Sequence, residues 1–369
     1  MYNIYLISFS DSEYDGRLRE LKKVFSSIGN LYLYDIGKRE NKNSNYVFSK
    51  KNYFKFILGA VKYGLNVNKK NGKNTILVLD NRKSIIPGLI LRMLLKEKII
   101  TVLDCRELYI SSEMKSMISK IGCYIEKIGV KKADIIIAAN KYRALKMKEL
   151  YRLTQLPVVF ENVRRLQFSS NADFDCLRER YKLFFKDDEI RVISTAGCSV
   201  SRTTDILVYN IDKVKKKCRL FLVGDSSVRD EARIKEIINL KKLENVEIIG
   251  KVGQDELKFL IQNCHIGIVN YNQIDTNNLY CASGKLYEFI YEGLPVLTTT
   301  NPPLRELCCK EKIGCSDDQF FGGINGIIEK YDFYRRNVLK FREKINIEKN
   351  NELLTNEILR RIVKINEDI

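Results

Sequence analysis

The chain has 369 residues, 45% hydrophobic and 10% aromatic, which is enough to bury two cores and excludes global disorder. Its single histidine excludes a histidine-rich metal centre, and its ten cysteines contain no Cys-x-x-Cys pair. The first residues lack the basic and then apolar pattern of a secretion signal, and no apolar run has the length of a membrane span. We therefore expect a soluble cytoplasmic protein with reduced thiols and no bound metal.

The net charge of +18 is unevenly distributed along the chain. Residues 1–165 contain 32 Lys and Arg against 15 Asp and Glu, a net charge of +17. The remaining residues contain 32 Lys and Arg against 31 Asp and Glu, a net charge of +1. Such an excess predicts an anionic partner for this half: a membrane surface, a pyrophosphate-bearing acceptor or nucleic acid. Alternatively, a composition rich in Lys, Asn and Ile simply biases the surface toward lysine.

Strands and helices alternate through the first half of the chain. Short apolar runs predict strands over 2–9, 31–36, 75–79, 99–104, 133–138 and 158–160. Apolar residues at helical spacing predict helices over 17–28, 48–68, 85–95, 112–130 and 141–151, of which 48–68 is basic and amphipathic.

The alternation resumes after a polar stretch over 162–190. Strands are expected over 191–196, 219–223, 246–249, 266–269 and 295–298, and helices over 204–215, 230–240, 255–263, 285–291 and from 317 onward. This order is typical of parallel, doubly wound sheets. We predict an acceptor domain (1–165), a linker (166–189), a donor domain (190–331) and C-terminal helices (332–369) that pack back on the first domain.

The segment SGKLYEFIYEGLP has the features of a phosphate site. Ser283 and Gly284 precede a predicted helix that starts at Lys285, and a helix N-terminus favours an anion. Glu288 lies one turn further on, where a carboxylate can accept hydrogen bonds from a ribose. Gly293 ends the helix. The plainer interpretation is a capped helix that leads into a strand, with Glu288 in solvent.

This segment resembles the donor-binding signature of family 4 (group 1) glycosyltransferases, which have the GT-B fold: two Rossmann-like domains that face a central cleft. In that family a glutamate stands five residues before a glycine that x-Pro-Val follows, as Glu288 does here before Gly293. The resemblance extends over most of 190–310. It implies a donor site in which one glutamate holds the ribose, cations and helix amides face the diphosphate, and backbone groups contact the base. The residues that it assigns to the donor are Arg202, Lys251, Val252, Ser283, Gly284, Lys285, Leu286 and Glu288.

The chain departs from the family pattern at two places. The first acid of the family's Glu-x7-Glu motif is Tyr280 here, which leaves the handling of the sugar open. The segment DCREL resembles the family's Asp-x-His-Glu, with arginine in the histidine's place. The candidate catalytic groups are therefore Asp104, Arg106 and Glu107, unless they only end a strand and begin a helix.

The loop after the first predicted strand resembles the family's acceptor-side loop. It supplies Asp15, Gly16 and Arg17 as acceptor-side candidates. Asp173 and Asp175 form an Asp-x-Asp pattern in the predicted linker, which we attribute to chance.

The resemblance implies a nucleotide-sugar-dependent glycosyltransferase of the hexosyltransferase type that retains configuration. It needs no metal and no cofactor besides its nucleotide-diphosphate-sugar co-substrate. The basic N-terminal half favours a lipid-linked glycan acceptor in polysaccharide assembly, with peripheral binding to the anionic inner face of the membrane. The alternatives are a non-catalytic glycosyltransferase-like protein, a protein that binds nucleic acid or another anionic surface, and a sugar-nucleotide epimerase. Aromatic residues at core spacings disfavour nucleic acid, and the single histidine disfavours the epimerase.

Overall fold

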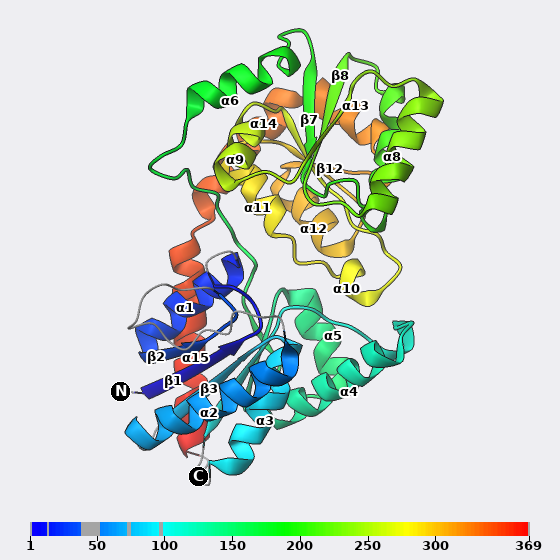
Figure 1. The fold of residues 1–369 in the computed structure, drawn as a ribbon. Helices are drawn as coiled ribbons and strands as arrows, with labels where there is room; N and C mark the ends of the chain where they lie inside the picture. The colour runs from blue at the N-terminus through cyan, green and yellow to red at the C-terminus, as the bar shows by residue number, and fades with distance from the viewer. Residues whose placement is uncertain (1, 13–14, 38–51, 72–74, 96–98, 368–369) are drawn as a thin grey trace. The chain divides into compact units, whose positions relative to one another are not determined.

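A computed structural model describes residues 2–12, 15–37, 52–71, 75–95 and 99–367. The chain divides into two compact units: Met1–Asn162 with Ile347–Ile369, and Val163–Asn346. Each unit is a six-stranded parallel sheet with helices on both faces (Figure 1).

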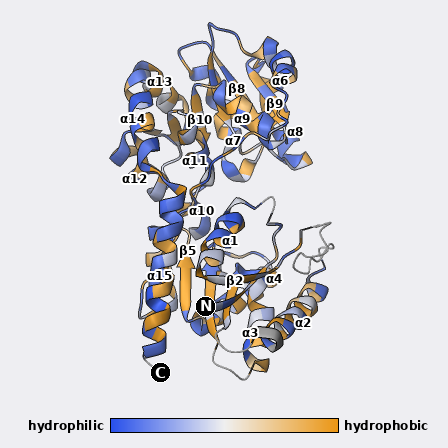
Figure 2. Ribbon diagram, turned by 90° about the vertical axis from the view of Figure 1, so that its left-hand side faces the viewer, coloured by the Kyte–Doolittle hydropathy of each residue, from blue (hydrophilic) through white to orange (hydrophobic). Residues whose placement is uncertain are grey.

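The sheet of the first unit has the order β2-β1-β3-β4-β5-β6. Its strands are β1 (Tyr2–Ser8), β2 (Gly29–Tyr34), β3 (Thr75–Asp80), β4 (Ile100–Cys105), β5 (Ile135–Ala138) and β6 (Val158–Val159). The central strands β3, β4 and β5 are largely apolar and buried along their whole length because both faces of the sheet are covered; β5 is orange along its length in Figure 2. Alternate residues face opposite sides, so Ile4 and Leu6 enter one core while Tyr5 and Ile7 enter the other.

The helices of the first unit connect its strands or pack on its faces. They are α1 (Gly16–Ile28), α2 (Tyr53–Asn71), α3 (Ile85–Leu94), α4 (Met117–Lys132), α5 (Lys141–Tyr151) and α15 (Ile347–Glu367), with short 3-10 turns η1 (Arg82–Ser84) and η2 (Ser111–Glu113). Although α15 comes from the end of the chain, it packs on α1 and β6 through Leu354, Ile358 and Ile362.

The sheet of the second unit has the order β12-β11-β10-β7-β8-β9. Its strands are β7 (Ile190–Ser194), β8 (Cys218–Val223), β9 (Val246–Gly250), β10 (Ile266–Val269), β11 (Val296–Thr298) and β12 (Gly314–Ser316). The strand order reverses between β7 and β10, and in the first unit between β1 and β3. Ligands of open parallel sheets bind beyond the carboxyl ends of strands at such points.

The helices of the second unit are shorter on average than those of the first. They are α6 (Phe174–Tyr181), α7 (Thr204–Asn210), α8 (Val228–Lys241), α9 (Gln254–Gln262), α10 (Thr276–Leu279), α11 (Gly284–Tyr291), α12 (Pro302–Glu311), α13 (Phe321–Glu329) and α14 (Tyr331–Lys344), with 3-10 turns η3 (Lys182–Phe184), η4 (Val200–Arg202) and η5 (Ile211–Lys213).

The structure differs from the predicted organisation in three places. The predicted group of C-terminal helices is divided, since α14 packs on α11 and α12 in the second unit and only α15 joins the first. The predicted linker contains α6, which Asp173 caps through a 3.0 Å bond from the Cys176 amide; this capping role accounts for the Asp-x-Asp pattern. Residues 48–51 of the predicted basic helix lie outside the described residues, and α2 begins at Tyr53.

The ten cysteines are all free thiols, of which Cys176 and Cys309 are exposed. Across the part of the chain that the structure describes, no helix has the length and hydropathy needed to cross a bilayer.

Candidate functional site

The N-terminus of α11 lies at the strand-order reversal of the second unit. Ser283 occupies the N-cap position, and the helix packs through Leu286, Phe289 and Ile290, which are all at most 1% exposed. Phe289 lies directly over Gly267 of β10, where an added Cβ would be 2.5 Å from the ring. Gly293 adopts φ +81° after the last turn, as the predicted stop requires. This packing fixes the polar face of α11 toward the loops after β7 and β10.

Lys285 is held in the first turn of α11. Its ammonium donates to the carbonyl oxygen of Thr195, the residue that follows β7. Burial lowers the pKa of Lys285 to about 8, and the positive charges of Arg202 and Arg164 act in the same direction. The Glu288 carboxylate opposes this shift without cancelling it. The side chain therefore lies in a region where a bound anion would stabilise its charged form.

Arg202 reaches the same region from η4. Its guanidinium stacks on Tyr271 at 3.9 Å from the ring centroid, and Nη1 donates to Asn278 Oδ1 at 3.4 Å. The Asn270 amide donates to the carbonyl oxygen of Arg202 and thereby fixes the turn. The predicted second cation is thus oriented by groups from the loop after β10 and from α10.

Glu288 is 8% exposed, and not solvated as the plainer interpretation of the motif supposed. Burial raises its pKa, while Arg164 and Lys285 lower it by a smaller amount. Arg164 Nε lies 3.5 Å from Glu288 Oε1. The sequence did not single out Arg164, because it stands far from α11 in the chain and within no motif.

Three buried polar atoms lie on residues of this site without a hydrogen-bond partner among the described residues: Thr195 Oγ1, Ser283 Oγ and Arg164 Nε. Native proteins rarely leave such atoms unpaired, since each costs roughly 1–3 kcal/mol. Their concentration around the first turn of α11 indicates a place built for a polar ligand.

The remaining donor candidates lie further away or contribute differently. Leu286 is a core residue, so only its backbone is available to a ligand. Lys251 is exposed and Val252 is partly buried after β9, which β8 separates from β7 in the sheet.

The candidates of the first unit form an ion-pair cluster at its strand-order reversal. Ser8, Asp80 and Asp104 lie in register across β1, β3 and β4. Arg106 donates from Nε and Nη2 to Asp80 at 2.5 and 2.7 Å, and from Nη1 to Asp15. Burial raises the pKa of Asp80 to about 6, against the opposing charge of Arg106.

Arg17 pairs with Asp104 in a bidentate geometry. The two bonds are 2.8 and 2.6 Å, and a third runs from Arg17 Nη1 to the carbonyl oxygen of Phe160 at 2.9 Å. Asp104 is fully buried and Arg17 is 6% exposed. Asp15 caps α1 through the Leu18 amide at 3.0 Å, and Gly16 begins that helix.

This arrangement changes the interpretation of two predicted catalytic groups. Asp104 has both oxygens engaged by Arg17, and Arg106 is surrounded by carboxylates, so both side chains hold the ion-pair cluster together. Glu107 is half-buried and bonded to Tyr109, whose pKa burial raises to about 12 with a contribution from Glu107. Glu161, which the sequence did not single out, also belongs near this cluster: burial raises its pKa to about 7 despite Arg17 and Arg143.

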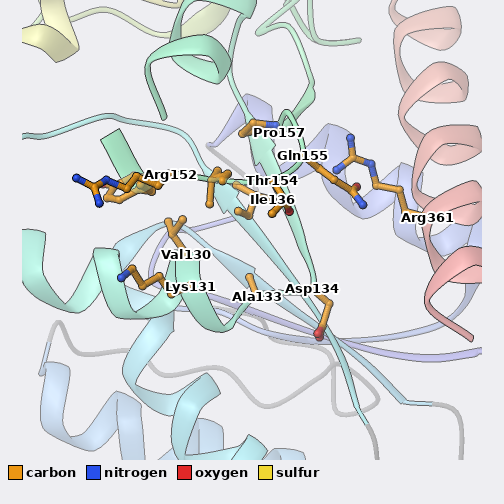
Figure 3. A pocket seen from close by; sticks show the side chains of 12 residues that line it. Val130, Lys131, Ala133, Asp134, Ile136, Arg152, Thr154, Gln155, Pro157 and Arg361 are labelled. Atoms are coloured by element: carbon orange, nitrogen blue, oxygen red, sulfur yellow. The ribbon is translucent and has the colours of Figure 1, made fainter. Parts of the chain in front are cut away.

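A pocket of the first unit lies at the amino ends of β5 and β6 (Figure 3). Residues that line it include Ala133 and Asp134, just before β5, and Pro157, just before β6. Lys131, Arg152 and Arg361 add positive charge. It contains none of the predicted site residues. In the described ranges, no group of three or more His, Cys, Asp or Glu side chains is arranged to hold a metal.

Comparison with known proteins gives the fold. No protein-family model matches the chain, and no curated protein matches it. Sucrose-phosphate synthase from Thermosynechococcus elongatus matches with a TM-score of 0.74 at 15% identity, covering 99% of this chain and 100% of that one. HepE from Anabaena, solved in complex with UDP and glucose, matches with a TM-score of 0.70 at 15% identity, covering 98% of this chain and 100% of that one.

The fold is GT-B. The expectation of two Rossmann-like units of this fold, similar to structures of glycosyltransferases, is confirmed. UDP-GlcNAc 2-epimerase from Neisseria meningitidis, bound to UDP-GlcNAc, has a similar fold. It matches with a TM-score of 0.57 at 9% identity, covering 98% of this chain and 100% of that one. Because these identities are low, the comparisons establish the architecture, and the reaction must be argued from the residues.

Proposed function

We propose that this protein is a nucleotide-sugar-dependent glycosyltransferase of the hexosyltransferase type, with its donor site at the N-terminus of α11. One observation carries the proposal: Lys285 and Arg202 converge, beside the buried Glu288, on a helix N-terminus at the strand-order reversal of a GT-B unit. Cations and helix amides suit a diphosphate, and a carboxylate one turn along the helix suits the ribose hydroxyls.

The chemistry follows from where charge develops. As the bond from the anomeric carbon to the donor phosphate breaks, negative charge grows on the departing nucleoside diphosphate. Lys285, Arg202 and the first amides of α11 stabilise that charge electrostatically, which is the contribution that a metal makes in other transferases. We propose transfer with retention of configuration and no metal requirement.

The first unit is proposed to bind the acceptor. In this proposal the Arg17–Asp104 and Arg106–Asp80 pairs are positioning groups that shape the carboxyl edge of the sheet. Glu107 and Glu161 are the carboxyl groups left to contact an acceptor hydroxyl. With a pKa of about 7, Glu161 is suited to exchange a proton near neutral pH.

The acceptor is proposed to be a lipid-linked glycan used in polysaccharide assembly, reached from an anionic membrane surface. Besides the net charge of +17 over 1–165, the first unit exposes apolar side chains next to lysines such as Lys120 and Lys127 of α4. The exposed apolar residues are Phe54 and Leu58 on α2, and Met117, Ile118, Ile121 and Tyr124 on α4. Such a surface is suited to shallow insertion between anionic headgroups. Sedimentation with phosphatidylglycerol vesicles tests this: binding that falls with salt is expected, and no binding at low salt contradicts it.

Turnover of a panel of UDP-, GDP- and ADP-sugars tests the reaction class. UDP-sugars come first, since HepE was solved with UDP and glucose. Nucleoside-diphosphate release that depends on a membrane-lipid extract is expected. Conversion of a nucleotide sugar into its epimer would instead support the epimerase, and binding of oligonucleotides without any turnover would support the nucleic-acid alternative.

A further inference from the structure

We propose that Arg164 is a third cation of the donor site and binds the donor's diphosphate at the N-terminus of α11. This inference rests on the proposed function and deepens it. Neither the signature segment nor the resemblance to other transferases assigns a role to this residue.

The first argument is the position of the guanidinium. An ideal Cβ on Gly284 would lie 1.9 Å from Arg164 Nε and 2.4 Å from Nη2, so the guanidinium lies directly on the Cα of Gly284. Gly284 is the first residue of α11, where the unpaired amides of the first turn point out of the helix. The glycine therefore makes room for the arginine, and the arginine lies where helix amides and phosphate oxygens would meet.

The second argument is that one guanidinium reaches both ends of the proposed donor position. Its Nε lies 3.5 Å from Glu288 Oε1, the carboxylate assigned to the ribose, and both Nε and Nη2 lie over Gly284 at the phosphate end. The planar fork of arginine suits this arrangement, because it can satisfy a carboxylate on one side and phosphate oxygens on another.

The third argument is charge balance. Arg164, Arg202 and Lys285 bring three basic side chains to a place where Glu288 supplies one carboxylate; burial lowers the pKa of Lys285, and the charges of Arg202 and Arg164 lower it further. A diphosphate offsets the surplus, whereas a neutral sugar or a nucleoside does not. The unpartnered Oγ of Ser283, a residue only 6% exposed, offers a donor at the same helix end.

A purely structural Arg164 would act only by neutralising Glu288. Its removal would then weaken nucleoside and nucleoside diphosphate equally, through the ribose. A diphosphate-binding Arg164 affects only ligands that carry phosphates. The difference between these two ligands separates the roles.

The experiment is calorimetric titration with uridine, UMP, UDP and inorganic pyrophosphate, and with the adenosine and guanosine series. The variants are Arg164→Gln, Arg164→Lys and, as a matched control, Arg165→Gln, because Arg165 is the adjacent arginine and stacks on Tyr291 at 5.5 Å. We expect Arg164→Gln to weaken the binding of the nucleoside diphosphate about 10- to 100-fold and Arg164→Lys to weaken it less. Arg165→Gln should bind the nucleoside diphosphate as tightly as the wild type. Nucleoside affinity should stay unchanged throughout.

Equal losses for nucleoside and nucleoside diphosphate, or no loss for the diphosphate, would overturn the inference while leaving the proposed function intact. If the wild type binds none of the nucleoside diphosphates, the proposed function is contradicted. Pyrophosphate binding then tests the role of Arg164. If the wild type binds pyrophosphate and Arg164→Gln does not, the inference is supported; if the wild type does not bind pyrophosphate, the inference is overturned. The unfolding temperatures of Arg164→Gln and Arg164→Lys should equal that of the wild type, which excludes a folding defect as the cause of any loss of affinity.

Discussion

Lys285 makes nucleoside-diphosphate affinity depend on pH in a direction that the structure specifies. Its pKa is about 8 in the structure, against 10.5 for an ordinary lysine. The charged form is therefore disfavoured by roughly 3 kcal/mol, at 1.36 kcal/mol per pKa unit. In the proposed donor site a bound diphosphate would lie against the ammonium and raise this pKa again. Below pH 8 the lysine is charged with or without ligand, and affinity is level; above pH 8, binding requires uptake of a proton and weakens as pH rises.

The expected loss can be worked out from this single group. If the pKa of the complex exceeds 10, the affinity falls by a factor of 1 + 10^(pH − pKa), which gives about a 30-fold loss at pH 9.5 relative to pH 7. Because an arginine side chain keeps its charge at every pH of this range, Lys285 is the cation at the N-terminus of α11 whose charge changes. Calorimetric titration between pH 7 and 9.5, repeated in two buffers of different ionisation enthalpy, measures both the affinity and the proton uptake.

Lys285→Arg is the matched control, because an arginine keeps its charge throughout this range. Its affinity should be level from pH 7 to 9.5, whereas the wild type should lose most of its affinity. A wild-type affinity that does not change with pH would refute the placement of Lys285 against the diphosphate. A pH dependence that persists in Lys285→Arg would assign it to another group.

Further predictions concern the remainder of the molecule. His265 accepts a 2.9 Å bond from the Arg191 amide, and burial lowers its pKa to about 4; because it is the only histidine, its single NMR signal should titrate near 4 and not near 6.5. Because that pKa lies below the unfolded value, its contribution to stability is present above pH 6.5 and is lost as pH falls toward 4. Two thiols, Cys176 and Cys309, should react promptly with a thiol reagent in the native protein, and each Cys→Ser variant should remove one; because seven of the other thiols are buried and Cys315 is half-buried, prompt reaction of many more would contradict the structure. Ile358→Ala on α15 should reduce the free energy of unfolding by about 2–5 kcal/mol, since Ile358 is fully buried, whereas Val363→Ala on the same helix, 52% exposed, should change it by less than about 1 kcal/mol. Equal effects in denaturant titrations would contradict the packing of α15 on the first unit.

Most strands could be predicted from the sequence because sheets covered on both faces require continuous apolar runs. β10 was predicted at Ile266–Val269, where the structure has it, and α5 agrees at both ends. The helices that were missed are short and lack a long apolar stripe. α12 begins at Pro302 with a proline in its first turn, which is a helix start signal, but no helix was predicted between 291 and 317.

The candidate site was most readily predicted where one segment carries several of its residues. Ser283 to Glu288 could be recognised because a helix N-terminus, a lysine and a glutamate follow one another in the chain. Arg164 could not be, since its contact with Gly284 exists only after folding. The sequence places Asp104 at the end of a strand and Arg106 just after it, but it does not reveal that Arg17 pairs with Asp104 and that Asp80 pairs with Arg106.

The most direct test of the account is acceptor-dependent release of nucleoside diphosphate from nucleotide sugars by wild type, Glu288→Gln and Glu231→Gln. Glu288→Gln keeps the shape of the side chain but loses its charge, and charge-assisted bonds of roughly 1.5–3 kcal/mol make a loss of about 10- to 100-fold in kcat/KM the expected result. Glu231→Gln makes the same change at a more exposed position on α8 and should match the wild type. Release from one donor that is lost only in Glu288→Gln is the predicted result. Release that is unaffected by Glu288→Gln, or no release and no donor binding across the panel, would contradict the account.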